Sequence, residues 1–220
     1  MAARNSFLRR NSLSLFVICF FLIFWAAQAF TGWAQFNEMR AEEGASAITL
    51  WRYLGSGEFA EVTFENWESE FFQMFLYVLA TVWPRQQGSS ESKPLTGESD
   101  VDKEPKSHPN APWPVKKGGL ALKLYRNSLS LAFLGLFLFS FAMHAWGSYR
   151  AELEDALLKH QPVETVVAFF SGPTFWFESF QNWQSEFLAI ASIVILSIWL
   201  RQHGSPESKP VDMAHDENPA

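Results

Sequence analysis

No Asp, Glu, Lys or Arg interrupts the chain between Arg10 and Glu38, and positions 13–30 read LSLFVICFFLIFWAAQAF. The stretch between Arg126 and Arg150 is also free of these residues, and its apolar run extends from Leu129 to Trp146. A helix needs about 20 residues, at about 1.5 Å of rise each, to cross ~30 Å of hydrocarbon. Both stretches are long enough, so the sequence predicts an all-α integral membrane protein.

Two further uncharged stretches are shorter, Phe71–Pro84 and Phe187–Leu200, and an arginine follows each of them. Each has 14 residues, a length that would also fit a buried or re-entrant helix. A Trp-containing segment precedes each stretch, and including its polar residues makes the helix long enough to cross. The sequence therefore predicts four transmembrane helices, at about 11–31, 65–84, 127–147 and 181–200.

The first span has an alternative interpretation as a cleavable signal peptide. Arg9 and Arg10 precede the apolar run, and Ala27-Gln28-Ala29 resembles a cleavage site. The run is longer than the roughly 7–15 residues of a signal's apolar region. A near-copy of it recurs as the third span, where no signal could act. We therefore expect a retained membrane anchor.

A shift of 116 positions aligns the chain with itself in three blocks without a gap. The matching pairs are 10–15 with 126–131 (RNSLSL in both), 64–71 with 180–187 (FENWESEF and FQNWQSEF), and 85–94 with 201–210 (RQQGSSESKP and RQHGSPESKP). One constant offset predicts two tandem repeats, each with two spans. Because two is an even number, both repeats enter the membrane in the same sense and lie in parallel orientation.

The polar segments set the domain boundaries. We expect a first repeat, a flexible cytoplasmic linker, a second repeat and a disordered tail, at 1–94, 95–119, 120–210 and 211–220. The linker is rich in Ser, Pro, Lys and Glu, and neither it nor the chain after Gly204 can bury enough apolar surface to fold alone.

The two loops on the other side are expected to hold short helices, at 38–43, ending at Gly44, and at 152–160. An apolar patch follows each one, and it fits either an interfacial element or a lid over an outer cavity.

Positive charge predicts the orientation of the spans. Thirteen of the 17 Lys and Arg residues fall before the first span, in the stretch from Arg85 to Arg126 between the second and third spans, and after the fourth span. The other two loops hold only Arg40, Arg52, Arg150 and Lys159. Cytoplasmic loops are enriched in Lys and Arg, so both termini are expected in the cytoplasm.

The repeated motif Asn-Trp-x-Ser-Glu-Phe has a purely structural interpretation. Asn66 and Asn182 could cap the first turns of the short spans and satisfy unpaired N–H groups. Trp67 and Trp183 would then anchor the spans at the head-group level. No ligand is needed for this arrangement.

The carboxylates of the same motif also suggest a functional site. Glu70 lies 15 residues before Arg85, about 22 Å of helix, and so falls several Å inside the outer hydrocarbon edge. Glu186 has the equivalent depth. A carboxylate there must pair, face a cavity or hold a proton. Gln28 and His144 occupy equivalent positions on the long spans, which predicts a Glu186–His144 pair with Glu70–Gln28 as its degenerate copy.

Other chemistries lack a sequence signature. The single cysteine, Cys19, excludes a disulfide framework within the chain and any cysteine-cluster metal site. There is no nucleophile elbow, phosphate-binding glycine loop or HExxH, and no basic footprint for nucleic acid. We therefore expect no cofactor, no metal and no catalytic residues, with an enzyme as the least favoured class.

Several segments resemble a family of bacterial multi-pass membrane proteins known only as a domain of unknown function. They are Thr31-Gly32, YLGSG at 53–57, FENWESEF at 64–71 and GSSESK at 88–93. The second repeat departs from the pattern at Pro173, Gln181 and Gln184, which puts equal activity of the two copies in doubt. The resemblance implies a bacterial inner membrane and brings no known activity.

Two functional hypotheses follow. The first is a non-enzymatic scaffold, sensor or partner-binding protein whose partners are the lipid bilayer and either a second copy or another membrane protein. The second is a small proton- or ion-linked permeation unit that uses the outer-leaflet carboxylates. Substitution of Glu70 or Glu186 separates them, because it would change stability in the first case and flux in the second.

Overall fold

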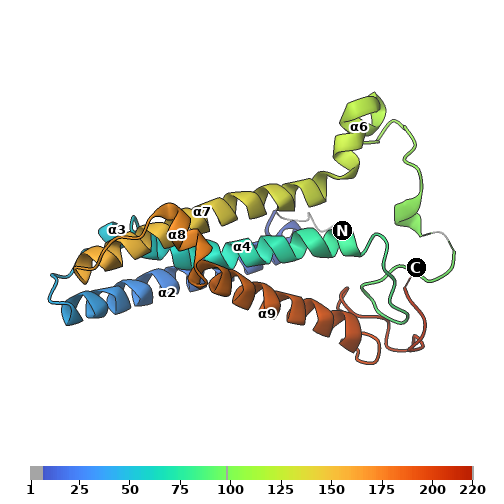
Figure 1. Cartoon of the computed structure of the whole chain (residues 1–220). Coiled ribbons are helices and arrows are strands. Elements are labelled where there is room, and N and C mark those ends of the chain that lie inside the picture. Colours follow the sequence, from blue (N-terminus) through green and yellow to red (C-terminus); the bar gives the residue numbers. More distant parts are fainter. Residues whose placement is uncertain (1–6, 98, 220) are drawn as a thin grey trace. The chain divides into compact units, whose positions relative to one another are not determined.

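The computed structural model describes residues 7–97 and 99–219, and every regular element there is helical (Figure 1). The order is α1 (Phe7–Arg10), α2 (Ser12–Glu42), α3 (Leu50–Tyr53), α4 (Gly57–Ala80), the 3-10 turn η1 (Asp100–Asp102), α5 (Trp113–Lys117), α6 (Gly119–Arg126), α7 (Ser128–Leu158), α8 (Val166–Ser171) and α9 (Thr174–Leu196). The all-α class is confirmed. Arg4 and the outermost positions of the predicted ranges 1–94 and 211–220 lie outside the described residues.

The two long helices, α2 and α7, have 31 residues each. Both end in the same way. Gly44 has a φ of 72° and His160 a φ of 54°, and a backbone bond closes each end, Ala45 N to Arg40 O at 2.8 Å and Gln161 N to Ala156 O at 2.9 Å. Gly44 therefore follows the last helical turn, as predicted.

Separate outer helices at 38–43 and 152–160 were a wrong expectation. These segments are the last turns of α2 and α7. No proline separates the apolar run of each helix from the charged segment that follows it.

Two of the described helices, α2 and α7, are long and apolar enough to cross a membrane, rather than the four that the sequence predicted. The helices α4 and α9 begin at Gly57 and Thr174, well before the expected starts of the second and fourth spans. Their first halves are therefore polar, with the segment 57–70 of α4 holding five glutamates. That polar half is the physical reason why these helices fall short.

Contacts divide the chain into two units, Met1–Thr63 with Ala145–Phe169 and Phe64–His144 with Phe170–Ala220. In the first unit, the beginning of α4 lies directly against the end of α7. A Cβ added to Gly147 would come within 2.5 Å of Glu61 N, and one added to Gly57 would meet the backbone of Ala151. Glycine at these positions is what allows the two backbones to approach so closely.

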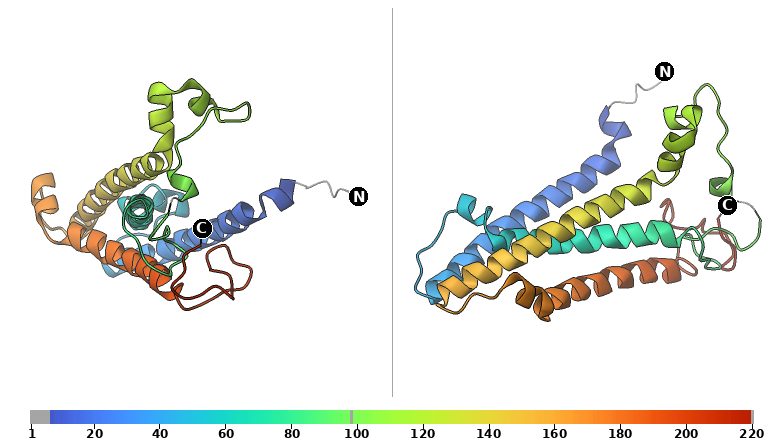
Figure 2. Two further views of the ribbon diagram at one scale, coloured as in Figure 1. Left: turned by 90° about the vertical axis from the view of Figure 1, so that its right-hand side faces the viewer. Right: turned by 45° about the horizontal axis from the view of Figure 1, so that its top comes forward.

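In the second unit, aromatic rings fill the space between α4, α7 and α9. Phe72 lies 4.9 Å from Phe137 and 4.6 Å from Trp183, measured between ring centroids. Figure 2 shows these segments of the three helices bordering one another, with α4 between the other two. Aromatic pairs at such distances favour tilted and edge-to-face packing over stacking face to face.

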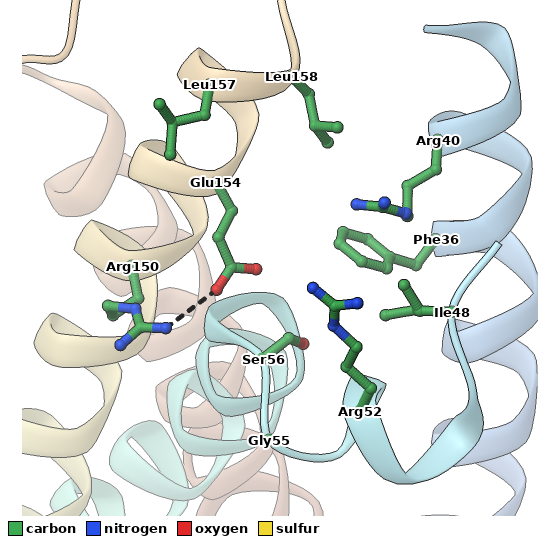
Figure 3. A pocket seen from close by; sticks show the side chains of 10 residues that line it. All are labelled: Phe36, Arg40, Ile48, Arg52, Gly55, Ser56, Arg150, Glu154, Leu157 and Leu158. Atoms are coloured by element: carbon green, nitrogen blue, oxygen red, sulfur yellow. Dashed lines mark hydrogen bonds and ion pairs between the residues drawn. The ribbon is translucent and has the colours of Figure 1, made fainter. Parts of the chain in front are cut away.

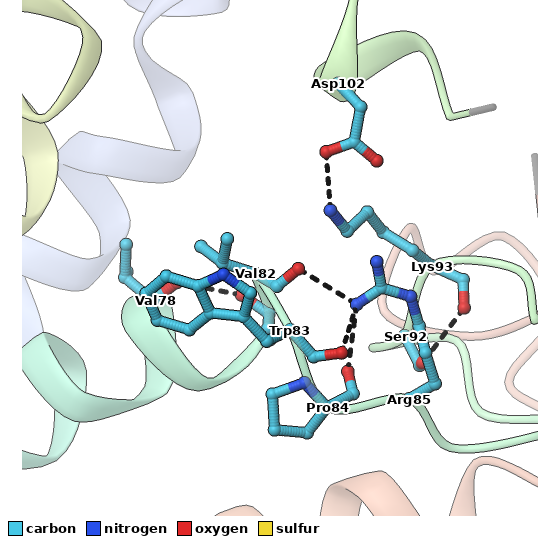
Figure 4. A network of polar contacts seen from close by, with 9 residues as sticks. Val78, Val82, Trp83, Pro84, Arg85, Ser92, Lys93 and Asp102 are labelled. Carbon is cyan, nitrogen blue, oxygen red and sulfur yellow. Dashed lines mark hydrogen bonds and ion pairs between the residues drawn. The ribbon is translucent and has the colours of Figure 1, made fainter.

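The segments after α4 and α9 are irregular but make many hydrogen bonds. Arg85 Nη1 donates to the carbonyls of Val82, Trp83 and Pro84, and Lys93 pairs with Asp102 at 2.6 Å (Figure 4). A basic side chain at the C-terminal end of a helix satisfies carbonyls that have no helical partner.

The described part of the tail, expected to be disordered, is tied to the segment after α4. Asn218 Nδ2 donates to the carbonyls of Gln86, Ser89 and Ser92. Lys209 is buried, and its Nζ donates to three carbonyls of the tail itself, those of Ala214, His215 and Glu217. Composition missed this order because its stabilising contacts are polar rather than apolar.

Candidate buried acid–imidazole site

A stripe of polar side chains runs along α7 at a spacing of four residues. Ser140, His144 and Ser148 share one face, and each has an exposed fraction of 2% or less. Residues four apart lie above one another on a helix, so the packed face of α7 carries a buried imidazole. A buried ionisable group needs partners to offset its lost hydration.

Glu68 supplies the first partner. Its Oε2 lies 2.7 Å from His144 Nδ1, and both side chains are fully buried. Trp183 Nε1 donates to the other carboxylate oxygen of Glu68 at 2.9 Å. Three helices thus meet at one carboxylate, α4 through Glu68, α7 through His144 and α9 through Trp183. This carboxylate–imidazole pair with an indole donor satisfies both oxygens of a group that is expensive to bury.

Glu178, also on α9, faces the other nitrogen of the same imidazole. Its Oε2 lies 3.8 Å from His144 Nε2, and neither atom has a hydrogen-bond partner within the described part of the chain. A separation of 3.8 Å is longer than a hydrogen bond. Phe175 lies beside the imidazole, with 4.7 Å between ring centroids. The imidazole thus has a paired nitrogen, Nδ1, and a nitrogen, Nε2, that faces a carboxylate oxygen without a hydrogen bond.

A third carboxylate completes the cluster. Glu65, one helical turn before Glu68, accepts a hydrogen bond from Asn182 Nδ2. Asn182 Nδ2 also donates to the Glu178 carbonyl at 3.3 Å. Two carboxylates therefore face the imidazole, Glu68 from α4 and Glu178 from α9, and Asn182 links Glu65 to the backbone of Glu178. Such a group can hold, release and pass on a proton.

The asparagines of the repeated motif do not cap helices, contrary to the prediction. Asn66 and Asn182 lie inside α4 and α9, which begin at Gly57 and Thr174. Their place at the border between polar and apolar sequence suggested a helix start, but the helix continues through that border. Asn182 instead links two carboxylate-bearing positions.

The structure brings His144 to Glu68 rather than to Glu186. Gln28 Nε2 donates to the Val62 carbonyl at 3.3 Å instead of to Glu70. The Glu186 carbonyl accepts from Gln73 Nε2 at 2.8 Å, and Glu70 is exposed.

The two tryptophans predicted as interface anchors differ in their surroundings. Trp67 packs edge-on against Phe64, with 5.2 Å between ring centroids. Trp183 donates to Glu68 and packs on Phe72 within the second unit.

Glu65, Glu68 and Glu178 were not recognised as site residues from the sequence. The signal that could have found them is helical spacing, because Glu65 and Glu68 are three residues apart and Glu178 and Asn182 are four apart. Depth along the helix selected Glu70, whereas the side of the helix decides which carboxylate reaches His144.

The chemistry open to this cluster is proton binding. Among residues 7–97 and 99–219, no group of three or more His, Cys, Asp or Glu side chains could hold a metal ion. Within the same described residues, no serine, cysteine or lysine hydrogen-bonds the imidazole as an activated nucleophile would.

Fold and site together define a helical protein with two candidate membrane helices and a buried acid–imidazole cluster. The chain belongs to the family described as "Domain of unknown function (DUF6766)", which matches residues 4–220. The resemblance seen in the sequence motifs is thereby confirmed at the level of the family. No curated protein and no solved structure matches the chain.

Proposed function

We propose that this chain is an integral membrane protein that senses protons through the Glu68–His144–Glu178 cluster. In this proposal α2 and α7 cross the membrane in the same direction, and α4 and α9 bring the chain back to the first side. The two halves of the chain are then tandem repeats in parallel orientation, and both termini are cytoplasmic. Proton binding at the cluster alters the packing of α4, α7 and α9 and is read by a partner protein or a second copy. The setting expected from the sequence motifs is a bacterial inner membrane.

The surface of α2 supports the membrane placement. Its apolar stretch has no buried residue, and Phe16 and Phe24 expose 63% and 65% of their surfaces. Burial of apolar surface is worth roughly 25 cal/mol per Å², so a helix exposed in this way would be unfavourable in water. Lipid removes that cost, and a helix satisfies all its backbone groups internally. A signal sequence near the N-terminus would share these features, and the similar composition of α7 favours an anchor.

The single observation that carries the sensing function is the complete burial of His144 between two carboxylates, Glu68 at Nδ1 and Glu178 at Nε2. Ionisable residues within membrane segments are rare and mark proton or ion sites. Histidine changes charge near neutral pH, which suits a sensor. The indole of Trp183 and the amide of Asn182 give the cluster direct contacts to α9, so a change in charge there is transmitted to another helix.

Proton-linked permeation is the second candidate, and the gap between His144 Nε2 and Glu178 Oε2 favours it. Both atoms lack a hydrogen-bond partner among the described residues, and the buried hydroxyls of Ser140 and Ser179 are likewise unpaired there. Unpaired buried polar groups suggest places for water or a moving proton. A sensor binds a proton without transporting it, whereas a permeation unit sustains a proton flux across the membrane.

The test is ¹⁵N-histidine magnetic resonance of the full chain in phosphatidylcholine nanodiscs, recorded between about pH 4 and pH 9. The His144 signals are those absent from the H144Q spectrum. We expect them to change with pH in the wild type and to be altered by Glu68→Gln, which removes the Nδ1 partner. Glu186→Gln is the matched control, because it removes a carboxylate of the repeated motif that does not touch His144.

His144 signals that stay constant over this pH range, or that respond equally to the two substitutions, would refute the proposal. Vesicles with a pH-sensitive dye separate the two functions. Proton flux that is lost in H144Q would assign permeation, and titration without flux would assign sensing.

A further inference from the structure

A second polar feature lies in the first unit, where a cavity of about 390 Å³ opens beside α3 (Figure 3). Three arginines and one glutamate line it, together with apolar side chains. The charged residues are Arg40 on α2, Arg52 on α3, and Arg150 and Glu154 on α7. The charged side chains therefore carry a net charge of +2.

The guanidinium of Arg40 is held in place at the cavity wall. Its Nε donates to the Ser46 carbonyl at 3.0 Å, and its Cζ lies 5.9 Å from the centre of the Phe36 ring. Arg40 is partly buried as a result. These contacts use one edge of the guanidinium and leave its terminal amino groups directed into the cavity (Figure 3).

Arg52 approaches the same space from α3. Its guanidinium faces that of Arg40 across Phe36 in Figure 3, and it donates to no described residue. Two like charges that converge on one cavity repel each other unless an anion lies between them. Glu154 does not fill that role completely, because its Oε1 is paired with Arg150 Nη2 at 3.3 Å.

Apart from Gly55 and Ser56, the rest of the wall is formed by apolar side chains. They are Phe36, Ile48, Leu157 and Leu158. A cavity that combines two guanidinium groups with apolar walls fits an anionic group that is attached to an apolar chain or that lies beside apolar side chains. Guanidinium groups bind phosphate through parallel hydrogen bonds, and a net +2 matches a phosphate that carries up to two negative charges.

We propose that this cavity binds a phosphate group, supplied either by the headgroup of an anionic phospholipid or by a free phosphate in solution. Arg40 and Arg52 hold the phosphate between them, and Arg150 completes the positive wall. The site is independent of the acid–imidazole cluster, and its ligand does not depend on proton sensing. It also gives a role to the arginines in segments that otherwise hold few basic residues.

The experiment uses the full chain in nanodiscs and has two arms. The first measures, by native mass spectrometry, how much phosphatidylglycerol remains bound after transfer from discs that also contain phosphatidylcholine. The second titrates inorganic phosphate calorimetrically into the protein in pure phosphatidylcholine discs. We expect binding in at least one arm, weakened roughly tenfold or more by Arg52→Gln, since one charge-assisted contact is lost.

Two further variants make the result specific. Lys159→Gln is the matched control, because it removes a positive charge next to Leu158 without changing the cavity lining. Arg52→Lys keeps the charge and loses the planar fork, so it should fall between wild type and Arg52→Gln. Arg52 is exposed and its side chain has no described partner, so these changes leave folding intact, as circular dichroism would verify.

Retention of phosphatidylglycerol alone identifies a lipid headgroup, and binding of inorganic phosphate alone identifies a free anion. Both outcomes support a phosphate site. Absence of binding in both arms, or equal weakening by Arg52→Gln and Lys159→Gln, overturns the proposal.

Discussion

The helices α2 and α7 have the same length, and both of their bounds differ by 116 positions, yet they carry different chemistry. Gln28 on α2 and His144 on α7 are also 116 apart. Gln28 donates to the backbone carbonyl of Val62, whereas His144 faces the side chain of Glu178, and positions 62 and 178 are again equivalent. The same framework therefore positions a neutral hydrogen bond at Gln28 and an ionisable contact at its equivalent, His144.

The arginine cavity differs between the halves in a similar way. Arg40 and Arg52 correspond to Ala156 and Ala168, and Arg150 corresponds to Ala34. Each half thus has alanine where the other contributes a guanidinium to the cavity. The long helices thus have equivalent bounds in the two halves, whereas the guanidinium side chains of the cavity occur at positions where the other half has alanine.

Replacement of His144 by alanine should have the largest effect. It leaves the buried Glu68 carboxylate without its imidazole, and breaking such a pair costs about 3–5 kcal/mol of unfolding free energy. The equivalent change, Gln28→Ala, removes one hydrogen bond and should cost about 1 kcal/mol. Reversible denaturation in mixed micelles, followed by circular dichroism, measures both. Equal losses of unfolding free energy in the two variants would mean that His144 and Gln28 contribute equally to stability. The buried acid–imidazole pair would then stabilise the fold no more than a single hydrogen bond.

Replacement of Gly147 by alanine should have an intermediate effect. The new Cβ would lie 2.5 Å from Glu61 N, so α4 or α7 must move, at a cost of about 1–3 kcal/mol. Thr31 is the equivalent residue on α2, is exposed, and bonds only within its own helix. We expect Thr31→Ala to change the midpoint of thermal unfolding much less. A tolerated Gly147→Ala would show that close backbone contact is not required.

The smallest expected effect is a loss of stability at alkaline pH that depends on Tyr53. The equivalent residue in the second half is Phe169. Burial, with a smaller contribution from the nearby Glu58 carboxylate, raises the pKa of Tyr53 from 10.0 to about 12. The folded state therefore retains a proton that the unfolded state releases, and stability falls as pH rises between about 10 and 12, by on the order of 2 kcal/mol. Tyr53→Phe should remove this part of the pH dependence, as denaturation at several alkaline pH values would reveal. An unchanged slope would assign the dependence to other groups.

The sequence was sufficient to predict the helical class, the starts of the long helices and the role of Gly44 at the end of α2. Charge-free runs and terminating residues act locally, so they can be read along the chain. The starts of α4 and α9 could not be predicted from apolarity, because their first halves are helical but polar. In these first halves Glu65, Glu68 and Asn182 are stabilised by partners that are distant in sequence.

The candidate site shows the same limit. Counting residues along the helices to estimate depth in the membrane identified His144 as a buried polar group, but it selected Glu70 and Glu186 as the carboxylates. Two residues along a helix turn a side chain by about 200°, so Glu68 and Glu70 point in very different directions at almost the same depth. Only the packing of α4 against α7 and α9 decides that Glu68 faces the imidazole.

The length of α2 has a consequence for access to the arginine cavity. A helix of 31 residues rises about 46 Å, whereas the hydrocarbon core is ~30 Å thick. In the proposed placement Arg40 lies about 42 Å from the start of α2, beyond the hydrocarbon edge and level with the outer part of the headgroup layer. Bilayer thickness would then act as a control on occupancy: a thicker membrane raises its phosphates toward the cavity, and a thinner one leaves the cavity to ions from the surrounding solution.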